Sequence, residues 1–229
     1  MNRKFIILIL VFQTFLAAEP NKAVKTIEKL NQSARNLKNL TADIEYIHAQ
    51  PLFETQTIRT GKIYYTKDTN NGALRINFQT LKQDDSKQQN YKEDYIFDGM
   101  KLTRIDYQSK SAITEQYSTD KPIEPLELVQ DYFPIIGLAN PQEMTQEYDI
   151  TVEGNKLKLI PKENSKFYNT YKQIEITIDS KFNLPVTFKA STAENEEITI
   201  KLGRIDISNK IKKEVFEISI PADFVHTAK

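Results

Sequence analysis

Beyond residue 40, apolar and polar residues alternate in one short run after another, and this period of two constrains the fold more than any other feature. Clear examples are the runs 41–48, 73–78, 173–178 and 197–202. Successive side chains of a β-strand point to opposite faces, so each run predicts a strand with one buried face. Turn signals such as Asp98-Gly99 separate the runs.

The number and spacing of these runs predict about ten or eleven strands. The last of them holds Phe216, Ile218 and Ile220 and ends at Pro221. Strands do not alternate with long helices, so the sheet should be antiparallel and the protein mainly β with a few helices. A large sheet with a single apolar face must cover that face, by curling around it and by packing helices over the opening.

Helices are predicted at two places. Val24, Ile27, Leu30, Ala34 and Leu37 recur at steps of three and four, which is typical of an amphipathic helix that ends near residue 39. Residues 121–147 are apolar and broken by prolines, and a short helix should open at Asn140-Pro141 and run to about residue 148.

The N-terminus has the features of a signal peptide spanning residues 1–18. Arg3 and Lys4 precede an apolar run at 5–16, and small residues at Ala17 and Ala18 offer a cleavage site. A membrane anchor is the alternative, but about a dozen residues are too few to span ~30 Å of hydrocarbon. We therefore expect an exported, periplasmic domain at 19–229. The chain has no cysteine, so the mature protein should not itself be a lipoprotein.

Composition and motifs argue against nucleic-acid binding and catalysis. The formal net charge is zero, so no basic field would attract nucleic acid. The two histidines, His48 and His226, are far apart, and no nucleophile or phosphate-binding motif occurs. The acidic pairs Glu93-Asp94, Asp84-Asp85 and Glu196-Glu197 are adjacent, so on strands they point to opposite faces, and we expect them to be solvated. No metal, cofactor or enzymatic activity is predicted.

Four stretches resemble the family of outer-membrane lipoprotein carriers and lipoprotein-sorting proteins, the LolA/LolB-like proteins. They are 33–44, 61–65 followed by 74–78, 95–99 leading into Leu102, and 215–221. In order and spacing they cover essentially the whole mature chain. Without a cysteine to acylate, the chain resembles the soluble, LolA-like branch.

The resemblance implies an incomplete, unclosed β-barrel covered by a helical lid, with an apolar cavity for the acyl chains of lipoproteins. It also implies that an inner-membrane transporter supplies the lipoprotein and an outer-membrane receptor accepts it. A monomer is expected. An ordinary filled core is the alternative for each cavity residue. The candidate acyl-binding residues are Ile44, Tyr46, Ile63, Tyr65, Leu74, Ile76, Phe78, Tyr95, Phe97, Ile174, Ile176, Ile178, Leu184 and Val186.

The lid candidates are Leu126, Val129, Phe133, Ile135 and Ile136, and a helix packed permanently on the sheet is the alternative to a mobile lid.

One departure from the family concerns a basic residue that helps control ligand uptake and release. Family carriers place it, followed by a proline, after the strand at 61–65. Here Lys67 takes that position without the proline, and Arg75 is a second candidate. A lysine lacks the rigid fork of an arginine.

Three functions therefore compete: a lipoprotein carrier, an envelope module that senses lipids or lipoproteins on the same fold, and a hydrolase or purely structural protein.

Overall fold

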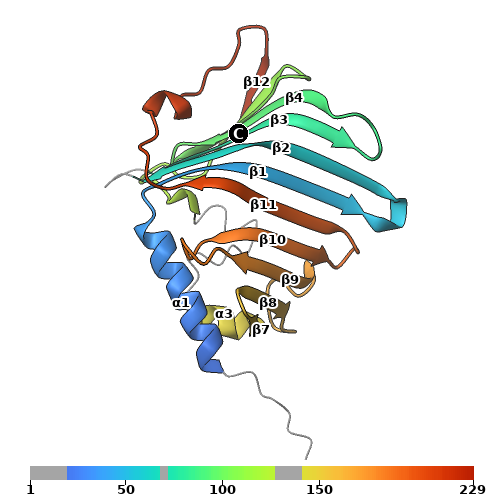
Figure 1. Ribbon diagram of the computed structural model, residues 1–229. Coiled ribbons are helices and arrows are strands. Elements are labelled where there is room, and N and C mark those ends of the chain that lie inside the picture. The colour runs from blue at the N-terminus through green and yellow to red at the C-terminus, as the bar shows by residue number, and fades with distance from the viewer. Residues whose placement is uncertain (1–19, 68–71, 127–140) are drawn as a thin grey trace, which may run out of the picture.

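The computed structural model describes residues 20–67, 72–126 and 141–229. Its centre is one twelve-stranded sheet in the order β12-β6-β5-β4-β3-β2-β1-β11-β10-β9-β8-β7 (Figure 1). Every neighbouring pair is antiparallel except β12 with β6, which is parallel. The sheet does not close on itself, because β7 and β12 are its two edges. The predicted unclosed, mainly antiparallel sheet is confirmed, with one or two more strands than expected.

The strands are β1 (Asn39–Gln50), β2 (Thr55–Lys67), β3 (Gly72–Gln83), β4 (Gln89–Phe97), β5 (Lys101–Asp106), β6 (Ser111–Gln116), β7 (Tyr148–Glu153), β8 (Lys156–Pro161), β9 (Tyr171–Ile178), β10 (Pro185–Thr192), β11 (Glu197–Asp206) and β12 (Val225–Ala228). The described helices are α1 (Pro20–Asn36) and α3 (Pro141–Glu147), and two 3₁₀ turns are η1 (Pro51–Phe53) and η2 (Lys213–Phe216). No helix in the described part of the chain is long and apolar enough to cross a membrane.

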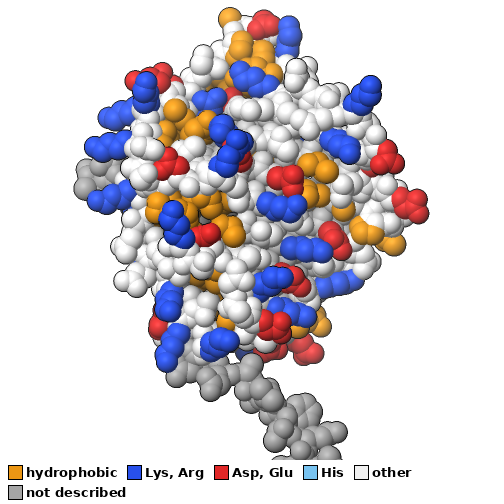
Figure 2. Space-filling view, in the orientation of Figure 1, with side chains coloured by type: hydrophobic (Ala, Val, Ile, Leu, Met, Phe, Trp, Pro, Cys, Tyr) orange, Lys and Arg blue, Asp and Glu red, His pale blue; other side chains and the backbone are white. Residues whose placement is uncertain are grey.

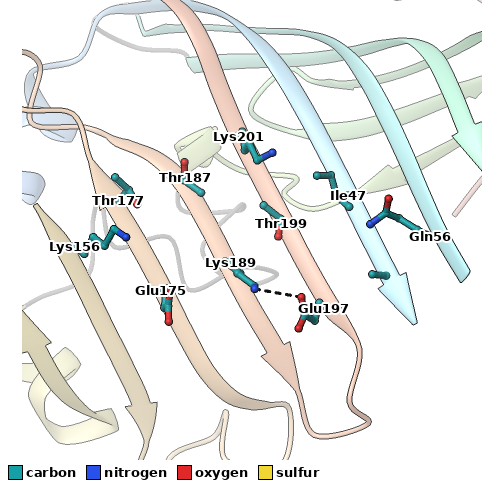
Figure 3. Close-up of a pocket in the computed structure, with 11 residues that line it drawn as sticks. Ile47, Gln56, Lys156, Glu175, Thr177, Thr187, Lys189, Glu197, Thr199 and Lys201 are labelled. Carbon is teal, nitrogen blue, oxygen red and sulfur yellow. Dashed lines mark ion pairs between the residues drawn. The ribbon is translucent and has the colours of Figure 1, made fainter. Parts of the chain in front are cut away.

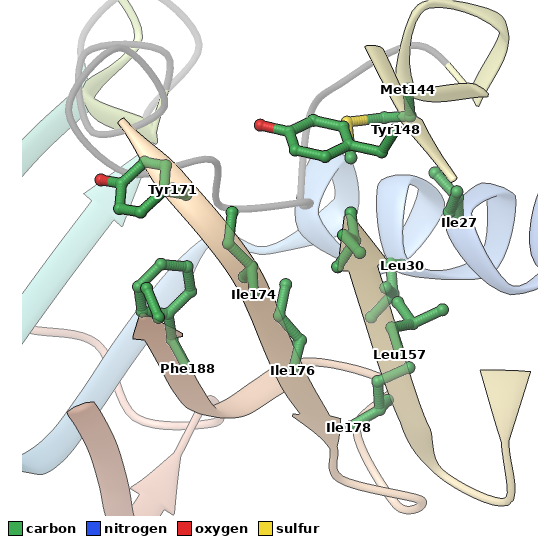
Figure 4. Packing of buried hydrophobic residues seen from close by; sticks show 12 residues of the cluster. Ile27, Leu30, Met144, Tyr148, Leu157, Tyr171, Ile174, Ile176, Ile178 and Phe188 are labelled. Carbon is green, nitrogen blue, oxygen red and sulfur yellow. The ribbon is translucent and has the colours of Figure 1, made fainter. Parts of the chain in front are cut away.

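Helix α1 forms where the apolar spacing predicted it, and it covers one end of the sheet. Ile27 and Leu30 are buried, and they pack with Met144 of α3 and with Leu157 and Ile176 of the sheet (Figure 4). Because Ile27 and Leu30 lie about one helical turn apart, they fall on the same side of α1, and this side contacts the sheet. This cluster fixes α1 over β7, β8 and β9.

The two faces of the sheet differ, as the alternation predicted. We call the face that carries Ile44, Ile63 and Ile76 the inner face, and the opposite one the outer face. Gly61 lies on the inner face, at a point where the backbones of β2 and β3 are close together. A Cβ atom there would lie 2.0 Å from the carbonyl oxygen of Asn77 and 2.7 Å from the Cα of Phe78. Only glycine fits between the backbones of β2 and β3 at this point, which is next to the register shift between Thr60 and Gly61.

We expect Gly61→Ala to lower the free energy of unfolding by about 1–3 kcal/mol, because the added methyl group meets backbone that must move. Urea unfolding followed by circular dichroism would measure this. Gly203→Ala is the matched control, since a Cβ at Gly203 has nothing within 4 Å. Equal stability of the two variants would contradict the close approach of β2 and β3.

The last predicted strand was placed wrongly. The structure has η2 at Lys213–Phe216 and no strand through Ile218 or Ile220; the terminal strand is β12, at Val225–Ala228. Ile220 instead packs on the outer-face cluster of Ile96 and Ile105. The apolar alternation there reflects a segment lying across the sheet, rather than a strand within it.

Candidate functional site

An apolar cavity of about 170 Å³ lies on the inner face, between the sheet and the C-terminal end of α1. Thr187 is the one polar residue among the described residues of its lining. The lining residues are Ala34, Leu37, Leu40, Ile44, Ile63, Leu74, Ile76, Leu126, Ile176, Leu184, Pro185, Val186, Thr187, Phe188, Ile200, Leu202 and Ile205.

The structure places the predicted acyl-binding residues in four groups. Those that line the cavity are Ile44, Ile63, Leu74, Ile76, Ile176, Leu184 and Val186. Tyr65 and Phe97 are fully buried in the cluster beside it, and Ile174 and Ile178 belong to the cluster under α1. Tyr46, Phe78 and Tyr95 lie farther along the inner face, where their rings contact one another.

Several lining residues were not predicted as ligand contacts. Ile200 and Leu202 come from β11, Ala34 comes from α1, and Leu37 follows the end of that helix. Their apolar periodicity was visible in the sequence. The sequence does not reveal that β11 pairs with β1. This pairing brings Leu202 opposite Ile44. The cavity is therefore lined by residues from the N-terminal part of the chain and by residues from its C-terminal part.

The segment that leads into the predicted lid is tied to the sheet beside the cavity. Glu124 accepts a hydrogen bond from the hydroxyl of Tyr65 at 2.7 Å and pairs with the Nζ of Lys67 at 2.7 Å. Burial, and next the hydrogen bond to Glu124, raise the pKa of Tyr65, so its hydroxyl stays a donor. Leu126 follows and lines the cavity. The other lid candidates, Val129, Phe133, Ile135 and Ile136, lie outside the described residues.

Arg75, the second basic candidate, is on the outer face, away from the cavity. It pairs with Asp94 at 2.8 Å and donates to the backbone carbonyl of Val215 at 2.7 Å. Asn77 and Tyr107 also donate to Asp94, whose side chain is fully buried. This network holds the C-terminal segment against the sheet.

Glu93, the neighbour of Asp94, points to the inner face and is also fully buried. It pairs with Arg59 at 3.1 Å and Arg104 at 2.6 Å, and it accepts hydrogen bonds from the hydroxyls of Tyr91 and Tyr95. The prediction that Glu93 and Asp94 point to opposite faces is correct, but the prediction that they are solvated is wrong. Arginines from strands β2, β3 and β5 take the place of water.

The outer face carries the solvated charges of the sheet. Lysines alternate there with acidic residues over β1, β11 and β10 (Figure 2). A polar groove of about 380 Å³ crosses this face, and in it Lys189 pairs with Glu197 at 3.3 Å (Figure 3). Lys201 pairs with Glu45 at 2.7 Å. The groove is thus lined by charges that neutralise one another.

The two histidines lie apart, as expected. His48 contacts Glu196 at 2.9 Å, and His226 contacts the hydroxyl of Thr114 at 3.0 Å. Across residues 20–67, 72–126 and 141–229, no three His, Cys, Asp or Glu side chains gather closely enough to hold a metal ion.

No protein-family model matches the sequence, and no curated protein sequence is significantly similar to it. Solved structures do share the fold. An uncharacterised conserved protein from Thermus thermophilus aligns over 91% of this chain and 99% of its own, with 9% identity and a TM-score of 0.54. MucB aligns over 90% of this chain with 10% identity and a TM-score of 0.54.

This chain spans 66% of the length of MucB, which has also been solved in a complex with MucA from Pseudomonas aeruginosa. A LolA superfamily protein from Nitrosomonas europaea is another structural neighbour, covered over 97% of its length, with 10% identity and a TM-score of 0.36. At these identities the comparisons establish the fold alone.

Proposed function

We propose that this chain, a LolA-like sheet with the fold of MucB, is a periplasmic carrier that binds the acyl chains of lipoproteins in its inner-face cavity. The observation that carries the proposal is the cavity itself, whose lining is apolar except for Thr187 in the part of the chain that the structure describes. Transfer of apolar surface from water contributes roughly 25 cal/mol per Å², so a buried acyl chain needs no specific polar contact to bind. Such a protein requires no catalytic residue.

The cavity must widen before it can hold a lipoprotein. Its volume of about 170 Å³ is smaller than the ~300–1,000 Å³ typical of sites for drug-sized ligands. Leu126 lines the cavity, and it follows directly on the segment held by Glu124. Release of Glu124 from Lys67 and Tyr65 would let Leu126 move away from the sheet. In this proposal Lys67 serves ligand uptake and release, and Arg75 does not.

Export and delivery belong to the same proposal. Residues 1–18 would act as a signal peptide and leave a protein that begins at Glu19. An inner-membrane transporter would supply acylated lipoproteins, and an outer-membrane receptor would accept them.

The test is to express the full chain in a bacterial periplasm and analyse the purified protein by mass spectrometry. We expect an intact mass that begins at Glu19, with triacylated lipoprotein bound. Ile76→Glu places a charge in the cavity wall and should abolish the bound acyl species. Ile47→Glu makes the same change in the outer-face groove and should retain them. Absence of acyl species from the wild-type protein would refute the carrier.

A second candidate is an envelope module that senses lipids or lipoproteins. The fold shared with MucB favours it, because MucB has been solved in a complex with MucA. The two functions differ in the cell: loss of a carrier strands lipoproteins on the inner membrane, whereas loss of a sensor leaves their distribution unchanged. Fractionation of the membranes of a depleted strain distinguishes them.

A further inference from the structure

Past the cavity, the inner face changes from aliphatic to aromatic and then to charged. Ile44 lies opposite Gly61, Gly61 opposite Phe78, and Phe78 opposite Glu93, so one row of the sheet links the cavity wall to the buried carboxylate. The ring of Phe78 lies 6.4 Å from that of Tyr46 and 6.3 Å from that of Tyr95. An amphiphile lying along this row would meet apolar side chains first and charged ones last.

The charged end of the row holds more donors than its carboxylate can use. Each guanidinium offers five N–H donors. Glu93 takes one from Nη1 of Arg59 and contacts Nε and Nη2 of Arg104, while two tyrosine hydroxyls fill its remaining positions. Burial, and next the charge of Glu93, raise the pKa of Tyr95 to about 12, so its hydroxyl remains a donor rather than a second anion.

The unused donors of Arg104 face accessible space. The Nε of Arg59 is buried without a partner among the described residues. The side chain of Arg104 is 45% exposed, and it borders a hollow of about 170 Å³ together with Asp106, Ser111 and Ile113. Arg59 also lies over the rings of Phe78 and Tyr91, which hold its guanidinium at the surface of the row.

We propose that Arg59 and Arg104 form a binding site for the anionic headgroup, a phosphate or a carboxylate, of an amphiphile whose chain occupies the cavity. This inference rests on the proposed function, and it names the ligand class of the same inner face. The charges of the two guanidinium groups are balanced by those of Glu93 and Asp106, so the site would recognise the headgroup through its free N–H donors, and the planar fork of arginine matches both headgroups.

Asp106 is the other acidic group at this hollow, and it is already engaged by its own turn. Its Oδ1 accepts hydrogen bonds from the backbone N–H groups of Gln108 and Ser109 at 2.9 and 3.1 Å. Burial opposes ionisation of Asp106, but these hydrogen bonds, together with the charge of Arg104, outweigh it and lower the pKa of the carboxyl. No hydrogen bond or ion pair joins the described side chains of Asp106 and Arg104, so the N–H donors of Arg104 remain for a ligand.

The experiment compares two probes with the same chain, dodecyl phosphate and dodecyl maltoside, by calorimetry on the mature protein below their micelle concentrations. We expect the phosphate probe to bind about tenfold more tightly, the difference typical of a charge-assisted hydrogen bond. Arg104→Gln should remove most of that preference and leave binding of the maltoside unchanged. Arg204→Gln is the matched control, because Arg204 pairs with Asp43 on the outer face.

The outcomes separate the two proposals. Failure of both probes to bind would refute the proposed function as well. Equal affinities in the wild-type protein, or a preference that survives Arg104→Gln, would overturn only the headgroup site. Inorganic phosphate that binds as tightly as dodecyl phosphate would show a site for a free anion instead. If Arg104→Gln does not fold, Arg104→Lys keeps the charge without the fork and should lose part of the preference.

Discussion

Asp94→Ala is expected to lower the free energy of unfolding by about 3–5 kcal/mol, because it leaves Arg75 without its partner under the C-terminal segment. The Asp94 side chain is fully buried and accepts hydrogen bonds from Arg75, Asn77 and Tyr107. Removing one member of such a pair strands the desolvated charge of the other. The loss should also loosen the contact between Arg75 and the carbonyl of Val215.

Urea unfolding and amide hydrogen exchange would check this result. Asp223→Ala is the control: Asp223 pairs with Lys110, both side chains are more than 60% exposed, and the pair should contribute less than about 1 kcal/mol. We also expect faster exchange in β12 of Asp94→Ala, because the segment that precedes β12 is held by Arg75. If Asp94→Ala lowers the free energy of unfolding no more than Asp223→Ala does, the contacts of Asp94 with Arg75, Asn77 and Tyr107 do not stabilise the fold.

Phe97→Ala is expected to destabilise the fold by about 3–5 kcal/mol, the usual cost of removing a buried aromatic ring. Phe97 is fully buried, lies opposite Leu74 in the β3–β4 pair, and contacts the ring of Tyr117 at 6.2 Å. Since Leu74 lines the cavity, the space vacated by Phe97 adjoins that cavity.

Thermal unfolding with and without dodecyl maltoside would measure both consequences. The probe should recover more stability in Phe97→Ala than in the wild-type protein, because it fills the added space. Phe53→Ala is the control, since Phe53 is 72% exposed at the tip of the β1–β2 hairpin and should change stability by less than about 0.5 kcal/mol. Equal rescue of the two variants would show that the space left by Phe97 is not connected to the site.

The sequence predicted the architecture well because the alternation of side chains is a local property. The stripe of α1 and the strands around Ile44, Ile76 and Ile176 follow from spacing alone, and half of the predicted acyl-binding residues line the cavity. The error at Ile218 and Ile220 has the same origin, since a segment that crosses a sheet can alternate just as a strand does.

The charged network could not be predicted in this way. Glu93 is separated from Arg59 by 34 positions and from Arg104 by 11. Only the register of β2, β4 and β5 brings them together. An adjacent acidic pair gives no sign of this, because burial of a carboxylate depends on partners from other strands. The contribution of β11 to the cavity could not be predicted for the same reason, because it depends on the pairing of β11 with the distant strand β1.

The pairing of β1 with β11 also governs how the chain can fold. It joins residues 41–49 to residues 197–206, so the two halves of the sheet stay separate until most of the polypeptide is available. Contacts between such distant positions make folding slow, since loop closure must precede any gain from pairing. The completed sheet is therefore a late product of synthesis, and a nascent chain truncated before residue 197 would lack both the central ladder and one wall of the cavity.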